Sequence, residues 1–362
     1  MAEFSAEQLK RISFFLFTFN NPKAKRILEK NEIDCDRFFR LDRTQLQKAG
    51  FSVGDTDRIR DDPWSSAEEE IEKLKKNRFE LVFKDEADFP PLLAQIYQPP
   101  EFIYLAGDRG VLKTRMLAVV GSRRASTYGY SALKRVLPDV CRAGLTIVSG
   151  MAYGIDSLSH QIALSQKTKT VGINAGGLLH LYPQGNLSLI RKIIGEGAVI
   201  SEFPLDTMAR PFLFPVRNRI IAGVSEAVLV AEATMRSGSL ITAKLALEQN
   251  RDVLAIPGSI DSPLSSGTNY LIQQGAKLVA STGDILEEFG LPTFSEPFTP
   301  PLISAKEKKI LDLMGENELK GIDYFVETLH FSASEMISLL MGLILKNLVC
   351  EEAGFYKKVY HG

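Results

Sequence analysis

The sequence is poor in cysteine and histidine and has no excess of either charge. Its 362 residues include 3 Cys and 4 His, and the formal net charge is −1. Cys35, Cys141 and Cys350 are far apart and odd in number, which argues against a disulfide framework and favours a reducing compartment. Neither Cys-x-x-Cys nor His-Glu-x-x-His occurs, so we expect no metal site. Because the net charge is close to zero, any affinity for a polyanion must come from a local basic patch.

Long apolar runs are also missing. No stretch is long enough to span a membrane, and the N-terminus lacks the basic and apolar segments of a signal peptide. Hydrophobic residues make up 45% and charged residues 24%, which is typical of soluble globular proteins. We therefore expect a cytoplasmic protein that does not bind membranes.

The chain is longer than one domain usually is, and its ends differ from its middle. Residues 1–65 predict short helices, including one over 22–30 and one within 41–51 that Gly50 closes. A charged helical connector follows over 68–76. Four prolines in 291–302 predict a linker. Three helical patterns (305–314, 323–329 and 333–345) and two β pieces (348–351 and 355–359) predict a small winged-helix domain over 304–362.

Between about residues 79 and 290, short β-rich runs alternate with helical runs. The predicted strands are 117–120, 146–148, 170–173, 198–200, 227–231 and 253–256, each followed by a turn rich in glycine or serine and a helix. This repetition predicts an α/β fold with a doubly wound, mostly parallel sheet. Right-handed crossovers would place the turns that follow the strands along one edge of that sheet.

Four of these turns combine glycine with hydroxyl side chains: 121–129, 149–156, 236–239 and 265–269. Glycine lets a ligand approach the backbone, and the helix that follows offers free N–H groups and the positive end of its dipole. One such turn is often only structural. Four on one edge, with arginines nearby, predict a surface for several phosphates in a row.

The arginines lie at informative positions. Arg123 is in the first turn, and Arg217 and Arg219 are near the start of a predicted helix, where a cation opposes the helix dipole. Arg217 and Arg219 therefore each need a nearby anion. This anion is either a ligand phosphate or a carboxylate of the protein, and the sequence leaves both alternatives open. Asp156 is predicted to cap the helix after the second turn, with His160 packed nearby.

Nucleotide cofactors are disfavoured. The first turn has no glycine between Gly121 and Gly129, and the second strand ends in Ser149-Gly150 instead of an acid, so the dinucleotide pattern is missing. No Gly-Lys-Ser/Thr occurs, which disfavours ATP. We expect no cofactor and no enzymatic activity. One alternative is a Rossmann-type nucleoside monophosphate hydrolase with Glu202 or Glu232 as its base, and another is a scaffold with vestigial turns.

Seven motifs occur in a characteristic order: residues 119–123 (VVGSR), 149–156 (SGMAYGID), 182–186 (YPQGN), 201–204 (SEFP), 214–223 (FPVRNRIIAG), 237–243 (SGSLITA) and 256–258 (IPG). Together they resemble the DNA-processing protein A (DprA/Smf) family over residues 79–290. The resemblance implies an extended Rossmann-like domain there. It also implies a small N-terminal all-α domain over 1–65, like a SAM or helix–hairpin–helix unit, and a C-terminal winged helix over 304–362.

The resemblance further implies single-stranded DNA binding, homodimerisation, and loading of the RecA recombinase onto incoming DNA in natural transformation or homologous recombination. The residues implied to contact DNA phosphates come from four segments: Gly121, Ser122 and Arg123; Gly150 and Gly154; Arg217, Asn218 and Arg219; and Ser237, Gly238 and Ser239. The sequence departs from the family pattern at Ala175, in place of a glycine, and at Leu179, in place of an acid. The acidic C-terminal region predicts a protein-interaction or structural module and not a reader of duplex DNA.

Overall fold

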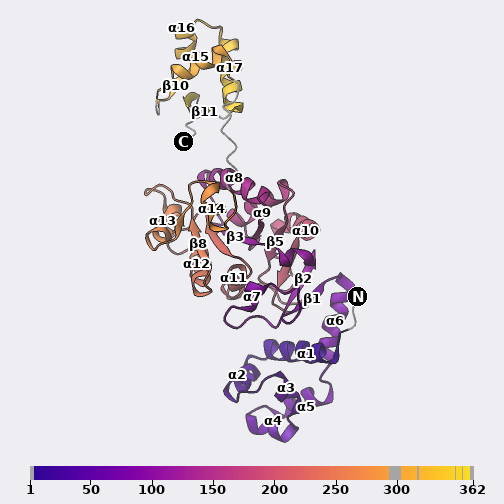
Figure 1. Cartoon of the computed structure of the whole chain (residues 1–362). Helices are drawn as coiled ribbons and strands as arrows, with labels where there is room; N and C mark the ends of the chain where they lie inside the picture. The colour runs from indigo at the N-terminus through magenta and orange to yellow at the C-terminus, as the bar shows by residue number, and fades with distance from the viewer. Residues whose placement is uncertain (1–3, 293–302, 316–317, 347, 353, 359–362) are drawn as a thin grey trace. The chain divides into compact units, whose positions relative to one another are not determined.

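The structure, a computed structural model, describes residues 4–292, 303–315, 318–346, 348–352 and 354–358. The chain forms two compact units, Met1–Thr293 and Phe294–Gly362 (Figure 1). Of the predicted linker, everything beyond residue 292 lies outside the described residues. Within the described residues, no helix is both long and apolar enough to cross a membrane.

The first unit is built on one sheet of nine strands among the described residues. In chain order these are β1 (Glu80–Phe83), β2 (Phe102–Gly107), β3 (Met116–Val120), β4 (Thr146–Ser149), β5 (Thr170–Ile173), β6 (Ala198–Ser201), β7 (Ala227–Val230), β8 (Asp252–Ala255) and β9 (Lys277–Leu278). The strand order is β1-β2-β6-β5-β4-β3-β7-β8-β9. In this spatial order, every neighbouring pair from β6 through β3 to β9 is parallel. By contrast, β2 is antiparallel to β6, and β1 is antiparallel to β2. The six predicted strands are confirmed as β3 to β8.

The order of the strands creates a crevice beside β3. The chain winds from β3 through β4 and β5 to β6, then returns to pair β7 with β3, with Val120 opposite Val230. The turns that follow β3 and β7 therefore leave neighbouring strands in opposite directions. In doubly wound sheets this switch point is where ligands bind.

Helices cover both faces of the sheet. One face packs against α7 (Pro91–Ala94), α11 (Leu213–Gly223), α12 (Gly238–Glu248) and α13 (Ser266–Gln273). The other face packs against α8 (Thr127–Arg142), α9 (Ile155–Ser165) and α14 (Thr282–Glu288). The central strands are buried on both faces, which explains why each reads as a continuous apolar run without alternation.

Among the described residues, six helices precede the sheet: α1 (Ala6–Asn20), α2 (Pro22–Lys30), α3 (Cys35–Arg40), α4 (Arg43–Ala49), α5 (Val53–Asp61) and α6 (Ser65–Asn77). The predicted helix over 22–30 is confirmed, and Gly50 ends α4 with a φ of 111°. The segment predicted as a charged connector is α6, and its apolar side is buried. Ile71 and Leu74 of α6 share a core cluster with Ile12 of α1. This cluster also contains Phe83 of β1, Phe102 of β2 and residues of α10 (Leu187–Glu196).

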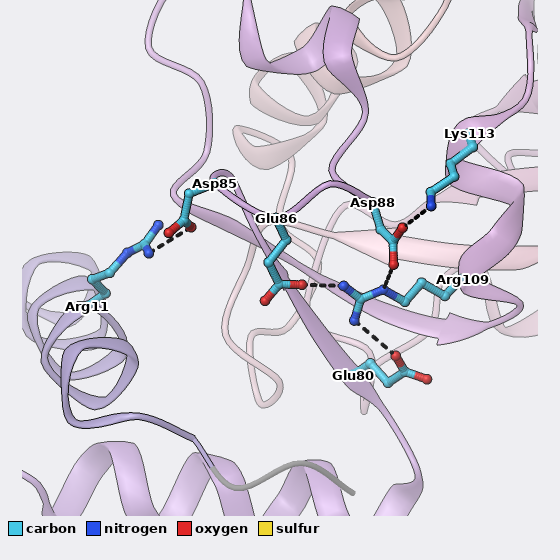
Figure 2. A network of polar contacts seen from close by, with 7 residues as sticks. All are labelled: Arg11, Glu80, Asp85, Glu86, Asp88, Arg109 and Lys113. Carbon is cyan, nitrogen blue, oxygen red and sulfur yellow. Dashed lines mark hydrogen bonds and ion pairs between the residues drawn. The ribbon is translucent and has the colours of Figure 1, made fainter.

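Ion pairs join the first helix and the antiparallel edge of the sheet. Figure 2 shows this network, which links α1, β1, the connection after β1 and the 3₁₀ helix η1 (Arg109–Lys113). Arg11 donates to Asp85 at 2.8 Å. Arg109 donates to Asp88 at 2.7 Å and lies 3.5 Å from Glu80. The network joins α1 and η1 to the β1–β2 edge of the sheet. None of its residues belongs to the turns that form the crevice beside β3.

The second unit contains α15 (Ala305–Asp312), β10 (Lys320–Gly321), α16 (Ile322–Leu329), α17 (Ala333–Leu345), β11 (Val349–Glu352) and β12 (Phe355–Lys358). Its strands are ordered β10-β12-β11. Ile310, Phe325 and Leu340 are fully buried in its core. The three predicted helices and both β pieces are confirmed, and β10 is an additional short strand that the sequence did not predict.

Candidate functional site

A cavity of about 260 Å³ lies at the switch point between β3 and β7. Its walls come from the turn after β3, the turn after β4, the start of α11 and the start of α12. Eight of the predicted contact residues line it: Gly121, Ser122, Arg123, Arg217, Asn218, Ser237, Gly238 and Ser239. The lining also includes Ala152, Asp156, Phe214, Thr234 and Thr242. The cavity therefore joins segments that are more than 100 residues apart in the sequence.

Close packing of two turns shapes one wall of the cavity. Gly154 has a φ of 75°, and a Cβ there would overlap the carbonyl oxygen of Ser122. The N–H of Ile155 donates to the same oxygen at 3.2 Å. A Cβ on Gly121 would lie 2.7 Å from the Ile155 side chain. Gly154 does not line the cavity; it lets the turn after β4 pack against the turn after β3.

Arg217 is a buried cation at the base of the cavity. Its Nη1 donates to the carbonyl oxygens of Gly150, at 2.9 Å, and of Ile173, and its Nε donates to Asn218 Oδ1 at 3.2 Å. Burial lowers the pKa of Arg217 to about 10, while the carboxylate of Asp156 opposes that change. The guanidinium is therefore still charged at neutral pH, and its orientation is fixed by main-chain acceptors.

Asp156 is the carboxylate that lines the cavity. It is buried, and its Oδ2 accepts the N–H of Ala152 at 3.3 Å. Burial raises the pKa of Asp156, and the charge of Arg217 opposes this increase most strongly. The predicted capping role is wrong: the N-cap of α9 is Gly154, and no side chain caps it. The difference arises because Asp156 lies inside the first turn of α9, two residues after the N-cap, and its carboxylate accepts an N–H of the preceding turn.

Arg123 is exposed at the mouth of the cavity. Its guanidinium carbon lies 5.2 Å from the centre of the Phe214 ring, and that of Arg217 lies 5.8 Å from the same centre. Both distances are within the range of cation–π contacts. Arg123 forms no hydrogen bond or ion pair through its side chain with any residue in the described ranges. Its charge is thus available to a ligand, with Phe214 positioning the guanidinium.

The start of α12 supplies N–H groups and hydroxyls to the same cavity. Ser237 is the N-cap and accepts the N–H of Ser239 at 3.3 Å, and the two hydroxyls are 2.6 Å apart. A Cβ on Gly238 would meet nothing within 4 Å. This helix terminus is therefore open, and the N–H of Gly238, the two hydroxyls and the helix dipole favour an anion.

Arg219 does not join the other two arginines. It forms an ion pair with Glu202, and its Nη1 donates to the carbonyl oxygen of Gln98 at 3.0 Å. Of the two anions that the sequence left open, the partner of Arg219 is the protein's own carboxylate. Arg217 and Arg219 are two residues apart on one helix, so they project about 200° apart around its axis. The helical period alone could have separated them.

The two acids considered as a hydrolytic base are engaged elsewhere. Buried Glu232 accepts the N–H of Ser126 at 2.9 Å and the Ser126 hydroxyl, which orders the start of α8. Glu202 is paired with Arg219, and burial raises its pKa to about 7. Neither lines the cavity. Nor does any group of three His, Cys, Asp or Glu side chains within the described ranges form a metal site.

The expectation of four phosphate-binding turns in a row is wrong for the fourth turn. Ser265 and Thr268 are buried, and a Cβ on Gly267 would lie 2.7 Å from the carbonyl oxygen of Ala233. The Asn269 side chain both donates to and accepts from the backbone of Gly258. This turn supports the turn after β7 from behind and does not reach the cavity.

The turn that departs from the family pattern still forms. The Asn174 side chain donates to the carbonyl oxygens of Gly176 and Gly177, each at 3.0 Å. Leu179 packs partly buried against the apolar cluster between α10 and the antiparallel strands. The apolar side chain at position 179 therefore contributes to the core and does not line the cavity.

Comparison with known proteins gives the same family. Residues 80–290 match the family described as DNA recombination-mediator protein A. The chain is also 33% identical over 328 residues to protein Smf of Escherichia coli (strain K12), which covers 88% of both chains. The chain belongs to the DNA recombination-mediator protein A family.

Solved structures of this family share the fold. DNA processing protein A (DprA) of Streptococcus pneumoniae matches with a TM-score of 0.60 and 35% identity, covering 79% of this chain and 99% of the other. DNA processing protein A of Helicobacter pylori matches with a TM-score of 0.54 and 27% identity, covering 59% of this chain and 95% of the other. The latter structure concerns the single-stranded DNA binding mode of the Helicobacter protein.

Proposed function

We propose that this chain binds single-stranded DNA and holds a backbone phosphate in the cavity between β3 and β7. The observation that carries the proposal is the convergence of exposed Arg123, buried Arg217 and the open start of α12 on one cavity. Membership of the DNA recombination-mediator protein A family supports it, as does the binding mode studied in the Helicobacter relative.

The contacts available to a phosphate are independent of base sequence. Arg123 can form a bidentate, charge-assisted pair with phosphate oxygens, and the start of α12 adds the N–H of Gly238 and the hydroxyls of Ser237 and Ser239. Arg217 contributes positive charge from a fixed position. Phe214, half-buried beside both guanidinium groups, is the aromatic ring best placed to contact a base. We propose that Gly154 and Arg219 act in packing and do not touch DNA.

The domain roles follow the same proposal. We assign residues 1–65 to a small helical domain of the SAM or helix–hairpin–helix kind, 79–290 to the extended Rossmann-like DNA-binding domain, and 304–362 to a winged-helix domain. The protein would act in the cytoplasm as a homodimer that protects incoming DNA and loads RecA in transformation or recombination. It would perform no covalent chemistry on the DNA.

The decisive experiment is filter binding of a labelled oligothymidylate over a series of salt concentrations. Phosphate contacts release counterions, so the affinity should fall steeply and log-linearly with salt. Absence of binding at low salt would contradict the proposal and favour the alternative of a scaffold with vestigial turns. A parallel chromatographic assay of nucleoside monophosphates tests the hydrolase alternative, for which we expect no turnover. Sedimentation of the free protein and RecA assembly on the bound oligonucleotide test the homodimer and the loading role.

A further inference from the structure

A second cavity, of about 660 Å³, lies among the N-terminal helices. Its floor is formed by α1, α2 and the segment that joins α2 to α3, with Phe14, Phe15, Leu28 and Ile33 as the apolar residues. We call this cavity the N-terminal groove. It shares no lining residue with the cavity between β3 and β7.

The floor of the N-terminal groove offers no free directional polar group. Thr18 lines it, but its hydroxyl donates to the carbonyl oxygen of Phe15 at 2.9 Å. Small-molecule sites usually combine an apolar wall with a few polar groups that orient the ligand. An apolar floor without such groups instead suits the side chains of a polypeptide whose polar part stays at the rim.

The rim carries more acids than bases. Glu29, Glu32, Asp34 and Glu101 line the groove, against Arg11 and Lys25. Both bases have acidic partners: Arg11 pairs with Glu101 and with Asp85, which is outside the groove, and Lys25 lies 4.0 Å from Glu29. Among the described residues, Glu32 and Asp34 have no cationic partner. The rim therefore has surplus negative charge.

The pKa of the half-buried Cys35 thiol also indicates negative charge around the groove. Burial, reinforced by the carboxylates of Glu7, Asp36 and Glu101, raises its pKa to about 12. A nucleic acid would meet repulsion at this rim, because its phosphates carry the same sign as the carboxylates. A partner that fits must combine apolar side chains with positive charge.

We infer that the N-terminal groove docks an amphipathic helix of a protein partner, with its apolar side on the floor and flanking Lys or Arg residues at the rim. Helices bind in apolar grooves through anchors spaced three to four residues apart. Opposite charges at the rim select the partner and speed its association. The groove would thus recruit a protein while the cavity between β3 and β7 remains open.

The test uses the full chain and a fluorescein-labelled, 18-residue helical peptide of leucine and lysine. A peptide with glutamate in place of lysine is the charge control. The variant E29K/E32K reverses two rim charges. The fold should tolerate both changes, because Glu29 is exposed in the last turn of α2 and Glu32 is exposed just after that helix. The matched variant E72K/E196K makes the same charge change at exposed sites outside the groove.

Fluorescence anisotropy should show saturable binding of the lysine peptide, at least tenfold weaker in E29K/E32K and within twofold of the parent in E72K/E196K. The glutamate peptide should not bind. A second variant, T18W, fills the floor without changing charge and should also weaken binding at least tenfold. Equal losses in both charge variants, or none in T18W, would overturn the inference. Loss of self-association in E29K/E32K with unchanged peptide binding would assign the groove to a second copy instead and also overturn it.

Discussion

Arg217 and Asp156 lie against the same main-chain point, the α-carbon of Gly150. A Cβ built there would be 2.7 Å from Arg217 Nη2 and 2.8 Å from Asp156 Oδ2. Gly150 therefore leaves space for one atom of the buried guanidinium and one atom of the buried carboxylate. This explains why glycine is needed in the turn after β4, although Gly150 itself does not line the cavity.

Replacing Gly150 with alanine should displace Arg217 from its acceptors. We expect G150A to destabilise the fold by about 1–3 kcal/mol, the usual cost of an overpacked site. Because Arg217 would lose its fixed position, single-stranded DNA affinity should also fall at least several-fold. Urea unfolding and filter binding measure the two effects.

The control is the same substitution at Gly195. This residue lies in α10, and a Cβ there would meet nothing within 4 Å. In a helix, alanine is preferred to glycine by about 0.5–1 kcal/mol, so G195A should be slightly stabilising and should leave DNA affinity unchanged. If G150A behaved like G195A, Gly150 would not govern the position of Arg217.

Arg123 should contribute to binding without contributing to stability. Its side chain is exposed, and R123A removes one charge-assisted hydrogen-bonding group for phosphate, so single-stranded DNA affinity should fall at least several-fold. The slope of log affinity against log salt should decrease by about 0.7 for each phosphate that the variant no longer neutralises. The melting temperature should not change.

Arg124 provides the neighbouring control. It is also exposed but does not line the cavity. R124A should therefore retain nearly the parent affinity. Equal decreases of affinity in R123A and R124A would point to diffuse electrostatic attraction and not to a phosphate held in the cavity.

Gly238 tests whether a ligand reaches the start of α12. Since a Cβ at this position meets open space, G238A should leave the melting temperature unchanged. If a phosphate approaches the N–H of Gly238, the added methyl group should obstruct it and lower DNA affinity several-fold. Unchanged affinity in a filter-binding assay would show that the phosphate contacts another part of the cavity.

His160 is buried in α9 in a neutral form. Its Nδ1 lies 2.7 Å from the Thr170 hydroxyl, which itself donates to the carbonyl oxygen of Ile147 at 2.7 Å. Nδ1 must therefore carry the proton and donate to Thr170, and Nε2 has no partner among the described residues. Burial, reinforced by the charge of Arg217, lowers the pKa of His160 to about 3.

This neutral imidazole predicts a pH dependence of stability. As the pH falls below about 6.5, the unfolded chain takes up a proton that folded His160 cannot accept, so the free energy of unfolding decreases. The decrease is about 1.4 kcal/mol per pH unit and continues toward pH 3. The stability that His160 gives is thus complete above its unfolded pKa and disappears in acid.

Urea unfolding of the parent and of H160L at pH 7, 6 and 5 isolates this contribution. Thr170 keeps its acceptor in H160L because it still donates to Ile147. The parent should lose up to about 2 kcal/mol more than H160L between pH 7 and pH 5. Glu202, whose pKa is about 7, changes protonation in the same range in both proteins and cancels. Parallel curves would mean that folded His160 takes up its proton over the same pH range as in the unfolded chain.

The arginines show where local pattern stops being informative. The positions of Arg217 and Arg219 near a helix start were evident from the sequence, and so was their need for anions. Glu202, which pairs with Arg219, and Asp156, whose charge acts on buried Arg217, come from other segments that only packing brings to α11. The two antiparallel strands β1 and β2 were missed for a similar reason, because no helix follows them in a regular strand–turn–helix repeat.

The sequence by itself determined the parallel sheet, the edge at which its turns meet and the glycine–serine turns after β3 and before α12. These follow from local periodicity and from backbone preferences, which need no distant partner. Only the tertiary structure decided which groups share the cavity. Arg217 is buried near Asp156, Arg219 pairs with Glu202, and the fourth turn packs against the turn after β7 instead of lining the cavity. These outcomes depend on side-chain direction and burial, which are set by residues far away in the chain.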